Sequence, residues 1–103
     1  MGRLITVAKL ADLPAGECLS VEVEGLGIAV FNVAGTIYAT DNTCPHAGGP
    51  LGEGTLFGHI VECPWHGWRY DVRTGERPAN PEFKVACFPV EIEGGLIKIR
   101  VPD

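Results

Sequence analysis

The chain has 103 residues and a mass of 11.0 kDa, enough for one domain with a single modest hydrophobic core. Its formal net charge of −5 argues against a nucleic-acid-binding protein that relies on a basic surface. No apolar run approaches the ~20 residues of a transmembrane helix, and the first residues lack the pattern of a secretion signal. We therefore expect a soluble, cytoplasmic protein that is monomeric and binds neither nucleic acid nor a membrane.

Residues 4–40 have the pattern of a β-meander. An apolar segment at 4–10 is followed by a turn rich in Pro and Gly, and residues 19–24 then alternate between apolar and polar side chains, which predicts a strand with one buried face. Residues 26–33 form a nearly continuous apolar run, and residues 36–40 follow a tight-turn signal. The 14 glycines and 8 prolines favour short strands joined by turns over long helices.

The second half of the chain predicts two further groups of strands separated by loops. Residues 55–57 and 59–61 flank Gly58 and predict a small hairpin, and residues 68–72 alternate again. Residues 78–81 cannot be a central strand, because two of them are prolines without an N–H to donate. The last strands are predicted from alternating apolar residues on either side of the Gly94-Gly95 turn: Phe88, Val90 and Ile92 before it, and Ile97, Ile99 and Val101 after it.

These patterns predict an all-β fold, an antiparallel sandwich or barrel built as a single domain over residues 1–103. Residues of about 42 to 82 interrupt the run of strands. We expect them to form a small subdomain at one end, inserted between the basal strands.

Two loops rich in Gly and Pro carry the residues with the most distinctive chemistry. Cys44 and His46 lie in the first loop, and Cys63 and His66 lie in the second. Two thiolates and two imidazoles suit zinc or an iron–sulfur centre. Structural zinc sites commonly use repeated Cys or His knuckles, whereas each loop here is mixed, which would let each loop reach two adjacent metal atoms. A zinc-stabilised interaction module stays open as an alternative.

The spacing Cys-x-His followed by Cys-x2-His closely resembles the Rieske [2Fe–2S] proteins, in which two His replace two Cys on one iron. The order of the predicted strands also fits that family along nearly the whole chain. The resemblance implies a Rieske-like fold and one [2Fe–2S] cluster. It places Cys44 and Cys63 on the inner iron, and His46 and His66 on the outer, more exposed iron.

The residues around the ligands are expected to shape the surroundings of the cluster. Gly48, Gly49 and Gly67 are expected to let backbone N–H groups approach the cluster sulfurs where a side chain would block them. The loop that ends at Pro81 resembles the loop that shields the cluster in the family. Tyr70 matches a family tyrosine that hydrogen-bonds a cysteine sulfur.

The sequence departs from the Rieske proteins of respiratory complexes at three positions. Gly49 and Trp65 stand where that type carries an extra disulfide, and Trp68 stands where it has a serine that bonds a cluster sulfur. With fewer donors to the sulfurs, the reduced cluster is less stabilised. We therefore expect a potential toward the low end of the Rieske range of roughly −150 to +300 mV.

The remaining residues do not supply a catalytic iron site. Rieske oxygenases add an iron held by two His and a carboxylate, but only His59 remains after the cluster takes two His. The resemblance therefore implies a non-enzymatic ferredoxin component of a bacterial aromatic-ring dioxygenase system. Such a carrier passes single electrons from a flavin-dependent reductase to a terminal oxygenase. The small subunit of an assimilatory nitrite reductase is a further alternative.

Several residues outside the motif are expected to be structural. Cys18, on the polar face of its strand, and Cys87 are expected to be thiols that form no disulfide in an intracellular protein. His59 is expected to be a structural strand residue. An alternative role for three aromatic residues is simple packing of the subdomain: Phe57, Trp65 and Trp68.

Overall fold

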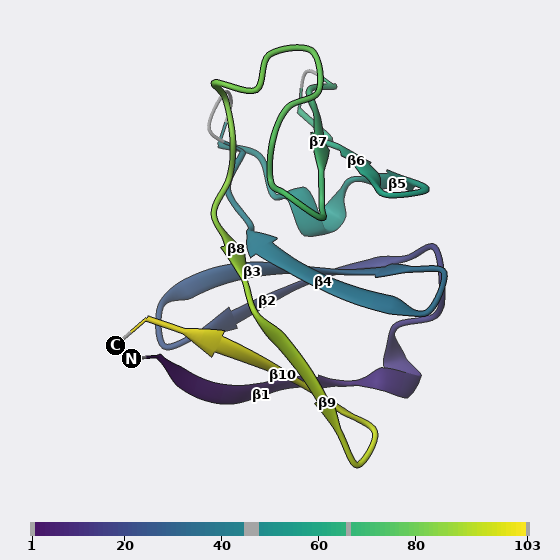
Figure 1. The fold of residues 1–103 in the computed structure, drawn as a ribbon, viewed down its shortest axis with the longest axis vertical. Helices are drawn as coiled ribbons and strands as arrows, with labels where there is room; N and C mark the ends of the chain where they lie inside the picture. The colour runs from purple at the N-terminus through teal and green to yellow at the C-terminus, as the bar shows by residue number, and fades with distance from the viewer. Residues whose placement is uncertain (1, 45–47, 66, 103) are drawn as a thin grey trace.

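The computed structural model describes residues 2–44, 48–65 and 67–102 (Figure 1). Within these residues, the chain forms ten β-strands and two short 3-10 turns, η1 (Leu10–Asp12) and η2 (Leu51–Glu53), and no α-helix. It follows that the described part has no helix with the length and apolar character needed to cross a membrane. The strands form three antiparallel sheets, so the predicted all-β antiparallel fold is confirmed.

Two sheets form the base of the molecule (Figure 1). The first has the order β1-β10-β9, and the second has the order β2-β3-β4-β8. Their bounds are β1 (Arg3–Lys9), β9 (Val90–Glu93), β10 (Leu96–Val101), β2 (Cys18–Val23), β3 (Leu26–Val33), β4 (Thr36–Asp41) and β8 (Cys87–Phe88). The apolar run at 26–33 is β3 without any change of bounds, and β2, β3 and β4 form a meander as predicted. The prediction that this meander begins with the segment at 4–10 was wrong, because β1 pairs with β10 in the other basal sheet.

Strand β3 is buried on both faces. Ile28 and Val30 point into the core between the two basal sheets, which the apolar residues of β10 also line. Ala29 and Phe31 alternate with them and point into a second core, which contains Cys44. All four β3 residues are 0% exposed, so this strand is the wall that the two cores share. Burial on both faces explains why β3 has a continuous apolar run and no alternation.

The third sheet lies at the upper end of the molecule in Figure 1, beyond the second basal sheet. Its order is β5 (Thr55–Phe57), β6 (Ile60–Glu62) and β7 (Arg69–Asp71), and the pairing of β5 with β6 is the predicted hairpin. The turn η2 joins this sheet to the base, because it packs against β2 and β3. At Gly52 in this turn, a Cβ would lie 2.6 Å from the carbonyl oxygen of Leu19, so only glycine fits there.

The polar face of β2 is partly covered, at Cys18 and Ser20 but not at Glu22, which the alternation of β2 did not predict. Cys18 is half-buried and packs against the second core, with its Sγ 3.8 Å from the carbonyl oxygen of Gly54. Ser20 on the same face donates a hydrogen bond of 3.3 Å to Oδ1 of Asn42. The prediction of a single buried face was wrong because the η2 segment folds back onto this strand. Burial raises the pKa of the Cys18 thiol to about 11, and the Glu17 carboxylate adds to the shift.

The predicted strand through Phe88, Val90 and Ile92 is divided in the structure. Phe88 pairs with β4 in the second sheet, whereas Val90 and Ile92 pair with β10 in the first sheet. Pro89 lies between them, and it has no N–H with which to continue a ladder. Its carbonyl oxygen accepts the N–H of Arg100 at 3.0 Å, so the chain crosses from one sheet to the other at this residue. Ile92 is 46% exposed, because β9 is the edge of its sheet.

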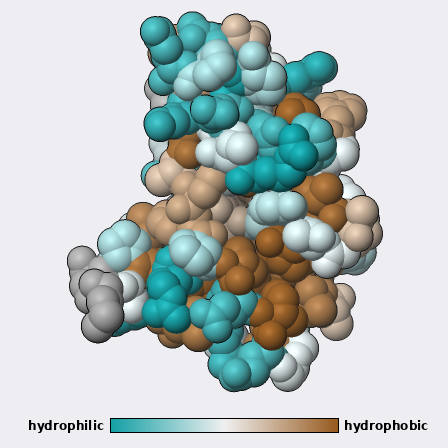
Figure 2. All heavy atoms as spheres, viewed as in Figure 1, coloured by the Kyte–Doolittle hydropathy of each residue, from teal (hydrophilic) through white to brown (hydrophobic). Residues whose placement is uncertain are grey.

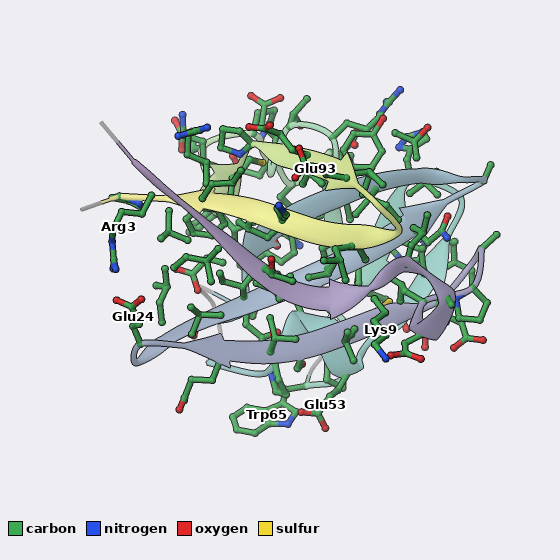
Figure 3. The ribbon with its side chains drawn as sticks, turned by 90° about the horizontal axis from the view of Figure 1, so that it is seen from below. Arg3, Lys9, Glu24, Glu53, Trp65 and Glu93 are labelled. Atoms are coloured by element: carbon green, nitrogen blue, oxygen red, sulfur yellow. The ribbon has the colours of Figure 1, made fainter. Side chains whose placement is uncertain are left out.

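An ion pair links the two basal sheets at the surface. Arg3 of β1 points toward Glu24, which lies in the turn between β2 and β3 (Figure 3), and Nη1 of Arg3 is 3.0 Å from Oε2 of Glu24. Hydrogen bonding to Arg3 lowers the pKa of Glu24. Both side chains are exposed, so the pair contributes little to the stability of the fold.

Figure 2 shows hydrophobic residues over the basal part and mainly hydrophilic residues at the upper end in this view.

Replacing Gly54 by Ala tests the close backbone contact between the end of η2 and the third sheet. A Cβ at Gly54 would lie 2.1 Å from the carbonyl oxygen of Glu62, and this backbone is held by the β5–β6 pairing. We expect Gly54→Ala to destabilise the protein by about 1–3 kcal/mol, with a fall in the thermal midpoint of roughly 4–8 °C per kcal/mol. Circular dichroism of the purified holoprotein at a fixed scan rate measures this.

Gly27→Ala is the matched control for this variant. Among the residues that the structure describes, a Cβ at Gly27 would meet only Cβ of Asn42, at 3.4 Å. The control is expected to change the stability by no more than about 0.5 kcal/mol. Equal midpoints for the two alanine variants would contradict the close approach at Gly54.

Candidate metal centre

The structure brings Cys44 and Cys63 together. Cys44 follows the end of β4, Cys63 follows β6, and each is only 1% exposed. Their thiols lie within hydrogen-bonding reach of each other, and the described residues, which include all four cysteines of the chain, contain no disulfide. The other two predicted ligands, His46 and His66, lie outside the described residues. Among the described residues, no group of three or more His, Cys, Asp and Glu side chains gathers around one point.

The two cysteine loops are closed in the same way. The N–H of Cys44 bonds the carbonyl oxygen of Gly49 at 2.9 Å, and the N–H of Cys63 bonds the carbonyl oxygen of Trp68 at 2.7 Å. In each loop the acceptor is the fifth residue after the cysteine. The N–H of Gly48 adds a bond of 2.8 Å to the carbonyl oxygen of Cys44. Each loop is therefore closed by a backbone hydrogen bond of the same kind.

Gly49 holds the first loop directly against the second. A Cβ on Gly49 would lie 2.8 Å from Cγ of Trp65 and 3.0 Å from Sγ of Cys63, so a side chain at this position would collide with the second loop. Among the described residues, a Cβ on Gly48 would meet nothing within 4 Å, and one on Gly67 would meet only Cδ of Glu62 at 4.0 Å. Their φ angles of +76° and +73° favour glycine at both positions. The approach of backbone N–H groups of the three glycines to the cluster sulfurs stays a prediction.

Two hydrogen-bond donors lie beside the cysteine sulfurs. The hydroxyl of Tyr70, a fully buried residue of β7, is 3.3 Å from Sγ of Cys44. Burial and the neighbouring thiol raise the pKa of Tyr70, so its phenol keeps its proton at neutral pH and can donate it to a thiolate. Burial also raises the pKa of the Cys63 thiol, while a hydrogen bond from the backbone N–H of Trp65 acts in the opposite direction. Both donors would bond more strongly to thiolates than to thiols.

The aromatic residues of this end have different surroundings. Trp65 is 51% exposed and projects away from the ribbon (Figure 3), and Phe57 is 53% exposed, so about half of each side chain is open to solvent. Trp68 does pack against the second core, and its ring meets that of Phe83 edge to face with centroids 5.3 Å apart. Pro81 is exposed, and its predicted shielding of the cluster stays a prediction.

Two residues of the third loop, the segment 77–83 between β7 and β8, were missed by the sequence analysis. Arg77 and Phe83 both contact Trp68, and the N–H of Arg77 bonds the carbonyl oxygen of Phe83 at 2.9 Å. Neither residue belongs to a spaced motif, so the sequence carries no signal for their meeting. His59, expected to be structural, lies immediately before β6 with its Nδ1 3.3 Å from Oδ2 of Asp71.

A model of the Rieske [2Fe–2S] domain matches residues 3–89. The chain belongs to this family. It is 40% identical over 98 residues to the ferredoxin component of the naphthalene 1,2-dioxygenase/salicylate 5-hydroxylase systems of Ralstonia sp, with 94% of each chain covered. It is also 40% identical over 101 residues to the ferredoxin component of the p-cumate 2,3-dioxygenase system of Pseudomonas putida, which covers 95% of this chain and 86% of that protein.

Two solved structures have closely similar folds. A ferredoxin of Sphingomonas yanoikuyae B1 superposes with a TM-score of 0.87 at 34% identity, covering 97% of this chain and all of that one. A chain from a complex of reduced oxygenase and oxidised ferredoxin in carbazole 1,9a-dioxygenase gives a TM-score of 0.85 at 32% identity, covering 97% of this chain and 94% of that one.

This Rieske protein carries one [2Fe–2S] cluster of the Rieske type. The described residues fit such a group. Cys44 and Cys63 are two buried, adjacent sulfur ligands, which is the number that one iron of this cluster takes from cysteine. The bare backbone at Gly49 leaves room against Cys63 that a side chain would fill. Soft thiolates in dry surroundings suit iron–sulfur chemistry.

Removing the Tyr70 hydroxyl tests whether it tunes this site. We expect Tyr70→Phe to keep the cluster and lower its reduction potential, because the donor bonds the more negative reduced state more strongly. A hydrogen bond worth about 1 kcal/mol corresponds to roughly 40 mV for one electron. Spectroelectrochemical titration measures the shift. Tyr38→Phe, on the half-buried face of β4, is the control and should leave the potential unchanged. The hydroxyl plays no such part if the two variants have the same potential.

Proposed function

We propose that this protein is the ferredoxin component of a multicomponent aromatic-ring dioxygenase system, a one-electron carrier with no catalytic site of its own. The observation that carries this proposal is the buried pair of cysteines in a chain of the Rieske family. Each cysteine lies in a loop that is closed by a backbone hydrogen bond of the same kind. The relatives described above are named as ferredoxin components of such systems and match nearly the whole of this chain. When bound, the cluster supplies reversible exchange of a single electron.

The ligand set that we propose is Cys44 and Cys63 on one iron, and His46 and His66 on the other. In this arrangement, residues of about 42 to 82 act as the unit that holds the cluster. The closed loops position the sulfurs, Tyr70 and the N–H of Trp65 donate to them, and the core around Cys44 excludes water. The burial of Cys44 and Cys63 supports the proposal that they hold the inner iron. The histidines would then hold the outer iron. This rigid, dry surrounding keeps the change of geometry small when an electron arrives.

The proposed partners are a terminal oxygenase that receives the electron and a flavin-dependent reductase that supplies it. The oxygenase is supported by the structural relative named as a complex of reduced oxygenase and oxidised ferredoxin. A two-electron reduced flavin would load two ferredoxin molecules with one electron each. The net charge of −5 favours partners with basic docking surfaces.

We further propose that the carrier works as a monomer in the cytoplasm. Strand β9 ends its sheet among the described residues, and two of its four residues, Glu91 and Glu93, are exposed acids. Charges on an edge strand oppose the pairing of two copies through that edge.

The test is the EPR spectrum of natively purified, dithionite-reduced protein, with analysis of iron, acid-labile sulfide and zinc in the same sample. A rhombic signal with the low average g of His-ligated [2Fe–2S], and equal amounts of iron and sulfide, is the expected result. Stoichiometric zinc in a colourless, EPR-silent sample would instead support the zinc-stabilised module. Co-purification with a sirohaem subunit would support the nitrite reductase alternative.

A further inference from the structure

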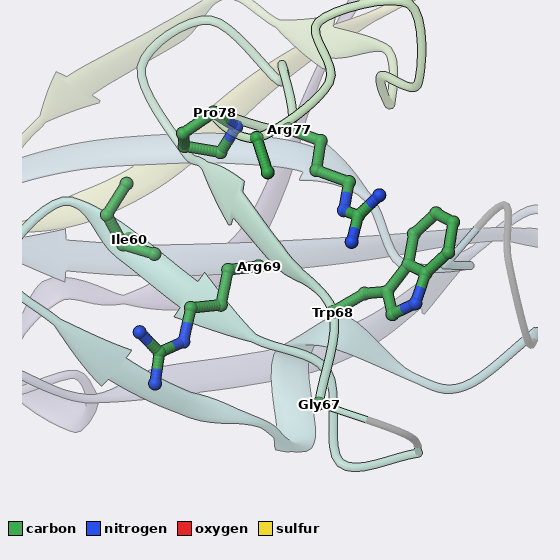
Figure 4. A pocket seen from close by; sticks show the side chains of 7 residues that line it. Ile60, Gly67, Trp68, Arg69, Arg77 and Pro78 are labelled. Carbon is green, nitrogen blue, oxygen red and sulfur yellow. The ribbon is translucent and has the colours of Figure 1, made fainter.

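Arg77 is held on the face of Trp68 at the start of the third loop. The guanidinium carbon of Arg77 lies 3.6 Å from the centroid of the indole, and Figure 4 shows the two side chains converging. The hydrogen bond from the N–H of Arg77 to Phe83, whose ring meets another side of Trp68, closes this arrangement. A cation within ~6 Å of an indole face is attracted by the ring. The charge of Arg77 is therefore fixed in one place.

Trp68, on which that charge lies, contacts the loop that carries Cys63. Its carbonyl oxygen accepts the N–H of Cys63 at 2.7 Å, and its side chain packs against the core that contains Cys44 and Cys63. The charge of Arg77 also affects the pKa of Tyr70. Burial dominates there and raises the pKa of Tyr70, but the charge of Arg77 acts in the opposite direction.

No carboxylate among the described residues lies within ion-pairing distance of Arg77, in contrast to the two arginines that precede it. Arg69 pairs with Glu62 at 3.0 Å, and Arg73 pairs with Asp71 at 2.9 Å. Arg77 instead lines an open cavity of about 350 Å³ together with Trp68, Arg69, Ile60 and Pro78 (Figure 4). Its charge is thus not cancelled by a neighbouring carboxylate of the described chain.

We propose that Arg77 raises the reduction potential of the cluster, by holding an uncompensated positive charge against Trp68, which contacts the loop that carries Cys63. Reduction adds one negative charge at the site, and a nearby cation stabilises the reduced state more than the oxidised state. This inference rests on the proposed electron-carrier function. The inference also makes Trp68 a positioning residue, because the guanidinium of Arg77 lies on its indole. This indole stands where Rieske proteins of the respiratory type have a serine that bonds a cluster sulfur.

The test compares the potentials of the holoproteins by spectroelectrochemical titration. Arg77→Gln removes the charge and keeps a long polar side chain, and Arg77→Lys keeps the charge. We expect the Gln variant to be about threefold to tenfold harder to reduce, which is roughly 30–60 mV at 59 mV per tenfold, and the Lys variant to keep most of the original potential. Arg100→Gln, which removes the same charge from β10 at the base, should leave the potential unchanged.

Two results would overturn the inference while leaving the electron-carrier function intact. One is a potential of Arg77→Gln equal to that of the original protein with the cluster present. The other is an equal fall in both Arg77 variants, which would assign the effect to packing and not to charge. If the Gln variant fails to hold the cluster, Arg77→Met is the second neutral variant for the same comparison. An original protein without the EPR signal of His-ligated [2Fe–2S] would overturn the proposed function and this inference together.

Discussion

The close approach of two loops at one glycine is the constraint on which this end of the molecule depends. Gly49 lies so near Cys63 and Trp65 that no side chain fits between them, and the loop that carries Cys44 is thereby fixed against the loop that carries Cys63. Family members of the respiratory type join the corresponding two positions by a disulfide. Here an indole lies on a bare backbone instead. The contact depends on packing and not on a covalent bond, so it is independent of the redox state of the surroundings.

The base of the molecule supports this contact through β3. Ala29 and Phe31 face the core around the cysteines, while Ile28 and Val30 face the core between the basal sheets. A change in the packing of one core therefore reaches the other through a single strand. The η2 turn adds a second connection, since Gly52 lies against the backbone of β2. The site and the base are coupled by close packing at two places, and this favours a site that moves little when the charge on it changes.

Local pattern predicted most of the strands, and the spacing of four residues predicted the family. Alternation and turn signals suffice where a strand's neighbours are close in sequence, as in the meander of β2, β3 and β4. They fail where a distant segment decides the outcome: η2 covers Cys18, and Pro89 transfers the chain between sheets. The sequence did not predict the positive φ angles of Gly48 and Gly67, because close approach and positive φ select the same residue. The contact of Arg77 with Trp68 was not predicted, because such stacking produces no periodic pattern in the sequence.

A tryptophan in place of a serine at position 68 exchanges one way of setting the reduction potential of the cluster for another. A serine hydroxyl at this position would act on a sulfur through a hydrogen bond, whose strength depends on a distance and an angle inside the protein. An indole removes that hydroxyl but offers a face for the guanidinium of Arg77. A charge acts over a longer range and needs no such alignment. Because Arg77 lines an open cavity, however, its effect also depends on what lies outside the protein. A partner that filled this cavity would act on the same charge that acts on the cluster.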